Sequence, residues 1–419
     1  MRKITWLIVV TILIIVIVII SNYKKHLQYD AHFSDLMLKI INSKNNEKIF
    51  HTINDEYDGH DINVLDVSGG GFKDMQYIVY LLRVNDHYLN ENIDMLRMFN
   101  VIGGISSGSI IACAIAFREL VFKHVLKNNK SEFIQCMQMF KYSDAQIVKC
   151  IAHIANESTQ LNYGTLILQW LFYLYLDLKT KLLNASVFKQ ITTLHGYLHP
   201  SLSSKNKHTY FKKYFDFDMK DIVKSRTFIS CGVIIPSKKP ALQTANQLIL
   251  FTNSTNSIND PNIIKPKYNI SNMADIINTT TNTTGIFSVN EQYPTAWDAG
   301  LYVNNTAMII ISLFTNYSPN LNLKYVALTN VTDLIYANDE GVLWWFRNLS
   351  NIFHIHTTYT TRMMQYIQKN KAQNIMFKNN TYAFNSSNDA TLNDIQSGIN
   401  ASTNDLITFI HNEIQRVNE

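Results

Sequence analysis

A serine between two glycines is the first group in this chain whose setting suits covalent chemistry. The residues Gly104-Ile105-Ser106-Ser107-Gly108 fit the pattern Gly-x-Ser-x-Gly. Apolar residues precede it and the small-residue run 110–116 follows, so we expect a strand, a tight corner and a helix. Such a corner exposes the serine hydroxyl near the positive end of the helix, where an oxyanion is stabilised. We therefore interpret Ser106 as a nucleophile, and Gly104 and Gly108 as positions where a Cβ would collide across the corner.

A run of glycines is the second candidate element. The segment Ser68-Gly69-Gly70-Gly71-Phe72-Lys73 follows a predicted strand, 62–67. Consecutive glycines between a strand and a helix leave backbone N–H groups free to converge on an anion. The segment lacks the Gly-Lys-Ser/Thr ending of a phosphate-binding loop and does not fit Gly-x-Gly-x-x-Gly. We therefore expect an oxyanion hole beside the serine, with Gly69, Gly70 and Gly71 supplying amides, and Lys73 either adding positive charge or lying on the surface.

A carboxylate followed by two small residues is the third candidate element. Asp298-Ala299-Gly300 precedes the paired amides Asn304-Asn305 by three residues. Small residues after the carboxylate let this backbone lie close to other segments. Taken alone, the segment is more typical of a turn in which the aspartate side chain binds a nearby amide.

Taken in this order, the three segments resemble the motifs of the patatin-like phospholipase family. The similarity covers the glycine-rich segment with its basic sixth residue, the serine corner, and the Asp-Ala-Gly segment with the two asparagines, and it extends from about residue 62 to 328. It implies an α/β fold, a three-layer α/β/α sandwich of patatin type. It also implies a serine–aspartate dyad that needs no metal and no cofactor.

In the mechanism that the resemblance implies, Ser106 attacks an acyl ester carbonyl and Asp298 accepts its proton. Asp298 then returns the proton to the leaving alcohol, and water hydrolyses the acyl-enzyme. A carboxylate is a weak base near neutral pH unless burial raises its pKa, so we expect an enclosed site. The expected activity is that of a membrane-anchored phospholipase A, with a membrane phospholipid or another acyl lipid as substrate.

Three positions depart from the family pattern without removing a reacting group. Asp74 stands where the family often has glycine after the basic residue, Ala299 replaces a glycine, and Thr306 replaces a proline. These departures keep open a catalytically inactive, membrane-anchored scaffold of the same fold. A Ser-His-Asp lipase is the other alternative, with His354 or His356 as base and Asp298 as third member.

The first 23 residues predict a membrane anchor. Residues 4–20 are almost continuously apolar and carry no charge, and the run through residue 23 is about 20 residues long, which is enough to span a bilayer. It is longer than a usual signal-peptide core, and no small-x-small cleavage site follows. We expect a single-pass anchor that contacts the bilayer through residues 4–23. The Asn-x-Ser/Thr triplets, which start only at residue 129, favour a luminal or extracellular catalytic domain.

The remaining sequence divides into a tether, 24–60, a patatin-like catalytic domain, 61–335, and a mainly helical C-terminal extension, 336–419. Within the domain we expect strands at 227–235, 247–251, 308–314 and 325–328, and a buried helix at 165–176 rather than a lipid-facing lid. The net charge of +5 includes no basic tract, which argues against nucleic acid as a partner. The four cysteines have no metal-ligand spacing and are expected to be buried thiols.

Overall fold

The chain is a mixed α/β protein with a central sheet in the computed structural model. The structure describes residues 61–85, 94–155, 163–182, 202–219, 226–234, 247–254, 263–264, 272–315, 322–329, 358–366 and 375–381, apart from isolated positions within these ranges. Residues 1–60, with the predicted anchor and tether, lie outside the described residues. In the part that is described, no helix combines the length and apolar character needed to cross a membrane.

Eight strands of the described residues form one sheet in the order β5-β4-β3-β2-β1-β7-β8, with β6 paired to β3. The strands are β1 (Asp61–Val67), β2 (Val101–Gly104), β3 (Thr227–Ile234), β4 (Gln247–Thr252), β5 (Ile263–Ile264), β6 (Ala296–Asp298), β7 (Asn322–Thr329) and β8 (Ile375–Thr381). Strands β3, β2, β1, β7 and β8 run parallel to one another, whereas β4 and β6 are antiparallel to β3.

The strand register brings three distant segments to one edge of the sheet. Val67, the last residue of β1, lies opposite Gly104, the last residue of β2. Gly104 in turn lies opposite Ser230 of β3, and two residues further along β3, Gly232 lies opposite Asp298. The glycine run, the serine corner and the aspartate segment therefore meet at the carboxyl ends of the central parallel strands, where open α/β sheets place their ligands.

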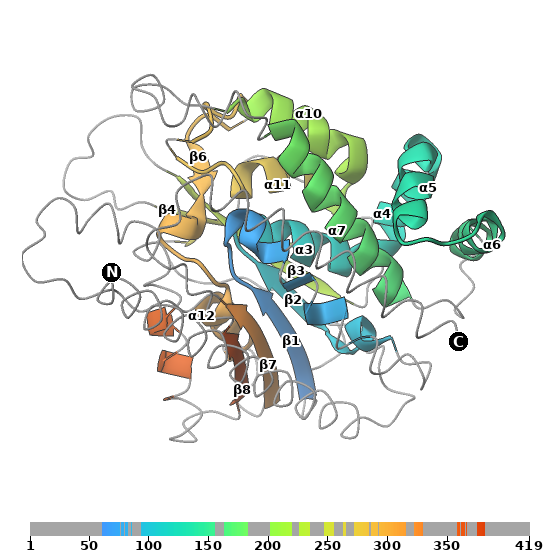
Figure 1. Ribbon diagram of the computed structural model, residues 1–419. Helices are drawn as coiled ribbons and strands as arrows, with labels where there is room; N and C mark the ends of the chain where they lie inside the picture. Colours follow the sequence, from blue (N-terminus) through green and yellow to red (C-terminus); the bar gives the residue numbers. More distant parts are fainter. Residues whose placement is uncertain are drawn as a thin grey trace, which may run out of the picture.

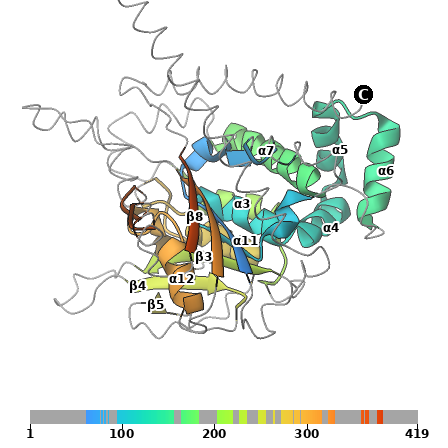
Figure 2. The same ribbon diagram turned by 90° about the horizontal axis from the view of Figure 1, so that it is seen from below.

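Helices cover both faces of this sheet (Figures 1 and 2). One face carries α3 (Ser107–Ala116), α4 (Arg118–Asn128), α7 (Tyr163–Leu182), α10 (Ser204–Phe215) and α11 (Met273–Thr280), with α5 (Lys130–Met139) and α6 (Asp144–Ala155) packed against them. Helix α12 (Ala307–Thr315) covers the other face. The described residues also include three short 3-10 turns, η2 (Gly71–Asp74), η3 (Met95–Met98) and η5 (Ala299–Leu301).

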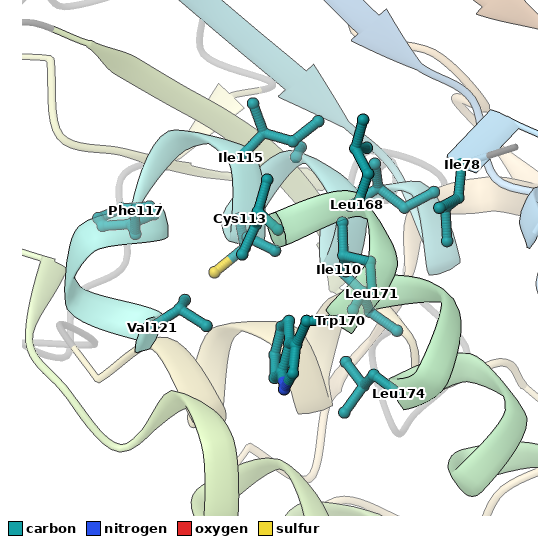
Figure 3. Packing of buried hydrophobic residues seen from close by; sticks show 14 of the residues in the cluster. Ile78, Ile110, Cys113, Ile115, Phe117, Val121, Leu168, Trp170, Leu171 and Leu174 are labelled. Carbon is teal, nitrogen blue, oxygen red and sulfur yellow. The ribbon is translucent and has the colours of Figure 1, made fainter. Parts of the chain in front are cut away.

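Two apolar clusters hold the layers together because the side chains of each strand alternate between the two faces. In β1, Leu65 and Val67 belong to the cluster with α3 and α7, whereas Ile62 and Val64 belong to the cluster with α12. Figure 3 shows the first cluster from close by, with Trp170 of α7 near Cys113 of α3. Trp170 and Cys113 are fully buried.

Several expected elements are confirmed. Strands β3, β4 and β7 lie where the sequence predicts strands, and α7 is a buried helix that includes the apolar segment 165–176. All four cysteines are buried and none forms a disulfide. These elements were recognisable because their apolar runs have the length of a strand or of a helix.

Two expectations differ from the structure. The predicted strand 308–314 is helix α12, since a short, uniformly apolar run has no periodicity that separates a strand from a buried helix. In the predicted helical extension, residues 358–366 include helical turns, but β8 is a strand that pairs with β7, so the sheet continues beyond residue 335. Asparagine is a residue type that is depleted in strands, so the two asparagines of β8 weaken the sequence signal for a strand there.

Candidate active site

Ser106 occupies a strained corner between β2 and α3. Its backbone dihedrals are φ 53° and ψ −131°, a region that residues other than glycine rarely adopt and that is concentrated at functional sites. A Cβ on Gly104 would lie 2.4 Å from the carbonyl oxygen of Gly108, and a Cβ on Gly108 would lie 2.2 Å from the carbonyl oxygen of Val67. The close approach of β1, β2 and α3 thus requires both glycines of the pattern.

The structure brings Asp298 to this corner. The Ser106 hydroxyl donates to Oδ2 of Asp298 over 2.5 Å, although the two residues are 192 positions apart. Thr283 Oγ1 donates to the same carboxylate oxygen over 3.0 Å. The Gly300 amide donates to Oδ1 over 2.8 Å, which is the local turn expected from the sequence. Asp298 is therefore fixed through Oδ1 by its own turn, while its Oδ2 faces the serine.

Burial gives this carboxylate the character of a base. Asp298 is 4% exposed, and burial raises its pKa above the ordinary value. Hydrogen bonds from Ser106, Gly300 and Thr283 oppose this effect, as does the positive charge of Lys207. The net result is a carboxylate with a higher proton affinity than an exposed aspartate, as proton transfer from a hydroxyl requires.

Gly69 lies directly against the nucleophile. A Cβ at this position would be 2.6 Å from Ser106 Cβ and 2.8 Å from Asn304 Oδ1, so the position accepts only glycine. Asn304 Nδ2 donates to the Gly69 carbonyl over 3.1 Å. Asn304 therefore joins the aspartate segment to the glycine run, which gives a physical role to the first of the two expected asparagines.

The other two glycine amides bind a serine side chain in this structure. The amides of Gly70 and Gly71 donate to Ser107 Oγ over 3.1 Å and 2.6 Å. The Ser107 hydroxyl donates in turn to Oδ2 of the buried Asp74 over 2.5 Å. Two amides that the sequence assigned to the oxyanion hole are thus engaged by Ser107. The backbone of Lys73 lies in η2, and its side chain is outside the described residues.

The backbone around Ser106 still offers donors to an oxyanion. Ser107 and Gly108 are the first residues of α3, so their amides have no carbonyl of that helix to bind. The amide of the residue after the nucleophile is the usual donor at such a corner. The positive end of α3 adds to the same effect.

A buried carboxylate that the sequence analysis missed holds the segment after Asp298. Asp66 of β1 accepts the Thr306 hydroxyl over 2.5 Å, the Thr306 amide over 3.1 Å and the Tyr325 hydroxyl over 2.7 Å. The neighbouring Asn305 accepts the Ala307 amide at the start of α12. A proline at position 306 would have no amide hydrogen to donate to Asp66. The buried carboxylate of Asp66 therefore gives a physical reason for a threonine here in place of the proline of the patatin-like pattern.

The other two departures also have defined surroundings. Ala299 is buried in the apolar cluster that includes Ile105 and Ile229, so its methyl group packs in the core. Gly300 is the residue that lies close to the base, because a Cβ there would be 3.1 Å from Asp298 Oδ1. Asp74 is the partner of Ser107.

Lys207 of α10 is the second functional candidate that the sequence analysis missed. It is 1% exposed, and burial lowers its pKa well below the ordinary value. In the sequence it resembles the other lysines of α10. The one available signal is its position three, four and seven residues before Tyr210, Phe211 and Tyr214, which places it on the apolar face of that helix.

The described histidines bind other groups. His124 Nε2 is 3.1 Å from the Lys213 carbonyl oxygen, and His208 Nε2 is 2.5 Å from Asp275 Oδ1. His354 and His356, the alternative bases, lie outside the described residues. Within the described site, the carboxylate of Asp298 contacts the nucleophile directly, at the position that an imidazole occupies in a triad.

The comparisons with known proteins add little to this geometry. No family model matches the chain, and no curated protein matches it. Among solved structures, it is similar to the crystal structure of VipD from Legionella pneumophila, with 10% sequence identity and a TM-score of 0.27. The matched region covers 86% of this chain and 66% of VipD. A TM-score of 0.27 is too low to assign a fold or a function, so both rest on the chain's own residues.

Proposed function

We propose that this protein hydrolyses acyl ester bonds of lipids through a Ser106–Asp298 dyad on a patatin-like fold. The observation that carries the proposal is the 2.5 Å hydrogen bond from Ser106 Oγ to Asp298 Oδ2 at a strained strand-to-helix corner. A hydroxyl bonded to a buried carboxylate beside free helix amides combines a nucleophile, a base and oxyanion donors.

The reaction follows from the positions of these groups. Ser106 Oγ forms a bond to the ester carbonyl carbon as its proton moves to Asp298 Oδ2, and the carbonyl oxygen becomes an oxyanion near the start of α3. Collapse of this intermediate breaks the bond to the alcohol, which takes the proton from Asp298. Water then attacks the acyl-enzyme, with Asp298 as base, and releases the fatty acid and free Ser106.

A lipid substrate is supported by exposed apolar side chains on the segments that follow Thr283 and Asp298 in the chain. Ile286 and Val289, on the segment after Thr283, are 43% and 51% exposed, and Tyr302, just after η5, is 38% exposed. Exposed apolar side chains around a site favour contact with lipid. The family resemblance favours phospholipids. The apolar residues 4–20 support a single-pass membrane protein. The Asn-x-Ser/Thr triplets from residue 129 onward favour a luminal or extracellular catalytic domain.

Hydrolysis of defined phospholipids by the wild type, Ser106→Ala and Asp298→Asn tests the proposal. We expect product release by the wild type and its loss in both variants. Equal activity of all three proteins would contradict the site assignment. Activity that survives both single substitutions His354→Ala and His356→Ala supports the dyad, whereas its loss in one of them supports the triad.

Labelling by a fluorophosphonate separates an enzyme from an inactive scaffold of the same fold. We expect labelling of the wild type and none of Ser106→Ala. An unlabelled wild type that also releases no product from any lipid would support the scaffold.

A further inference from the structure

Lys207 is a buried lysine whose amine binds the turn that contacts the candidate base. Its Nζ donates to the carbonyl oxygen of Asn278 over 3.1 Å, to Thr281 Oγ1 over 3.1 Å and to Asn282 Oδ1 over 3.4 Å. It also lies 4.0 Å from the centroid of the Phe287 ring. The ammonium is therefore enclosed by the end of α11 and the turn that follows it.

This turn holds Asp298 in place. The carbonyl oxygen of Asn282 accepts the Asp298 amide over 3.1 Å, and Thr283 Oγ1 donates to the Asp298 carboxylate over 3.0 Å. Lys207 binds Thr281 and Asn282 on the same turn. One contact to Asp298 comes from Asn282, which Lys207 binds, and the other comes from the next residue, Thr283. By fixing this turn, Lys207 therefore also fixes the base.

The direct partners of Lys207 Nζ are neutral groups: a carbonyl oxygen, a hydroxyl, an amide oxygen and the Phe287 ring. In the part of the chain that the structure describes, Lys207 forms no ion pair with a carboxylate. The neighbouring Asp275 of α11 pairs with His208 instead, and Glu291, beyond Phe287, is exposed. The negative charge of Asp298 raises the pKa of Lys207, against the larger effect of burial. An isolated buried charge is costly, so a lysine here requires a compensating interaction.

We propose that Lys207 is a positioning residue of the dyad, whose ammonium fixes the 278–283 turn and stabilises the negative charge of Asp298. This inference rests on the proposed function only where it predicts an effect of Lys207 on the rate of ester hydrolysis. A base must be ionised to accept the serine proton, and the buried setting of Asp298 favours its neutral form. The lysine charge opposes this effect from a distance without occupying the carboxylate oxygens that face Ser106 and Gly300.

The test measures the pH dependence of kcat/KM on a soluble carboxylic ester and the pKa of Asp298 by carbon-13 NMR titration. The NMR signal is assigned with Asp298→Asn and requires no substrate. Removal of the positive charge in Lys207→Met should move the acid limb and the Asp298 pKa upward by about one pH unit, as expected for loss of a nearby opposite charge. Lys207→Arg, which keeps the charge, and Lys212→Met, at an exposed position of the same helix, should leave both midpoints unchanged.

A purely structural role would lower kcat without moving either midpoint, so unchanged midpoints in a folded Lys207→Met would overturn the proposal. If Lys207→Met does not fold, Lys207→Gln, which keeps a hydrogen-bond donor but not the charge, is expected to give the same upward shift. A shifted midpoint in Lys207→Arg would equally count against it. Absence of hydrolysis by the wild type would refute the proposed function and leave the NMR titration to decide the role of Lys207.

Discussion

Thr306 donates both its amide and its hydroxyl to the carboxylate of Asp66, a residue 240 positions earlier in the chain. This contact joins the segment after the candidate base to β1, the strand that precedes the glycine run. Gly103 of β2 packs against the same side chain, where a Cβ would lie 2.0 Å from Thr306 Oγ1. The two halves of the site are therefore connected through a buried polar network below the dyad.

Replacement of Thr306 by proline, the residue at this position in the patatin-like pattern that the sequence resembles, is expected to destabilise this protein. The substitution removes two donors and leaves a buried carboxylate with Tyr325 as its remaining described side-chain donor, at a cost of about 2–5 kcal/mol in the free energy of unfolding. Urea unfolding measures the change. Thr306→Ser keeps both donors and should lose less than half as much, so equal losses would show that the hydrogen bonds to Asp66 are unimportant.

Asp66 also makes stability depend on pH. Burial raises its pKa in the folded protein above the ordinary value of 3.8. The folded state then binds the proton more tightly than the unfolded state, so the contribution of Asp66 to stability is greatest below pH 3.8 and is lost as the pH rises through the folded-state pKa. In Asp66→Asn, the free energy of unfolding should fall less steeply over this window than in the wild type. Asp144→Asn, at an exposed position of α6, is the control, and a slope for Asp66→Asn equal to the wild-type slope would contradict the prediction.

Ser107 is expected to support catalysis by holding the glycine run. Its side chain accepts the amides of Gly70 and Gly71 and donates to Asp74. Ser107→Ala releases the Gly71 amide and leaves the Gly70 amide bound to Asp74 Oδ2 alone. We expect kcat to fall about 10- to 100-fold with little change in KM, as for small displacements of catalytic groups. Steady-state kinetics on a soluble ester measure both constants. Ser107→Thr keeps the hydroxyl and should retain most activity, and an Ala variant as fast as the wild type would mean that Ser107 does not position the turn.

The sequence was most informative where backbone geometry restricts residue type. Gly104, Gly108 and Gly69 lie where a Cβ would meet backbone or side-chain atoms within 3 Å, so their pattern predicted the corner and the turn before the fold was known. Asp298 was recognisable only through its resemblance to a family motif, since nothing in the local sequence indicates a contact across 192 residues.

Buried charges were not predictable in the same way. Asp66 lies in a strand and Lys207 in a lysine-rich helix, and in both cases the charge is buried because distant segments supply its hydrogen bonds. Thr283 likewise contacts Asp298 through a turn that is defined only by tertiary packing. The helix α12 was mistaken for a strand because its apolar run lacks periodicity, and that uncertainty is removed only by its packing on the sheet.

The most direct measurement of the central claim is the rate and site of acylation by an activated carboxylic ester, followed by mass spectrometry of the intact protein and its peptides. We expect one acyl group on Ser106 of the wild type, none in Ser106→Ala, and acylation slowed by at least about 100-fold in Asp298→Asn, which lacks the base. An acyl group on another residue, or an Asp298→Asn variant that is acylated as fast as the wild type, would contradict the dyad.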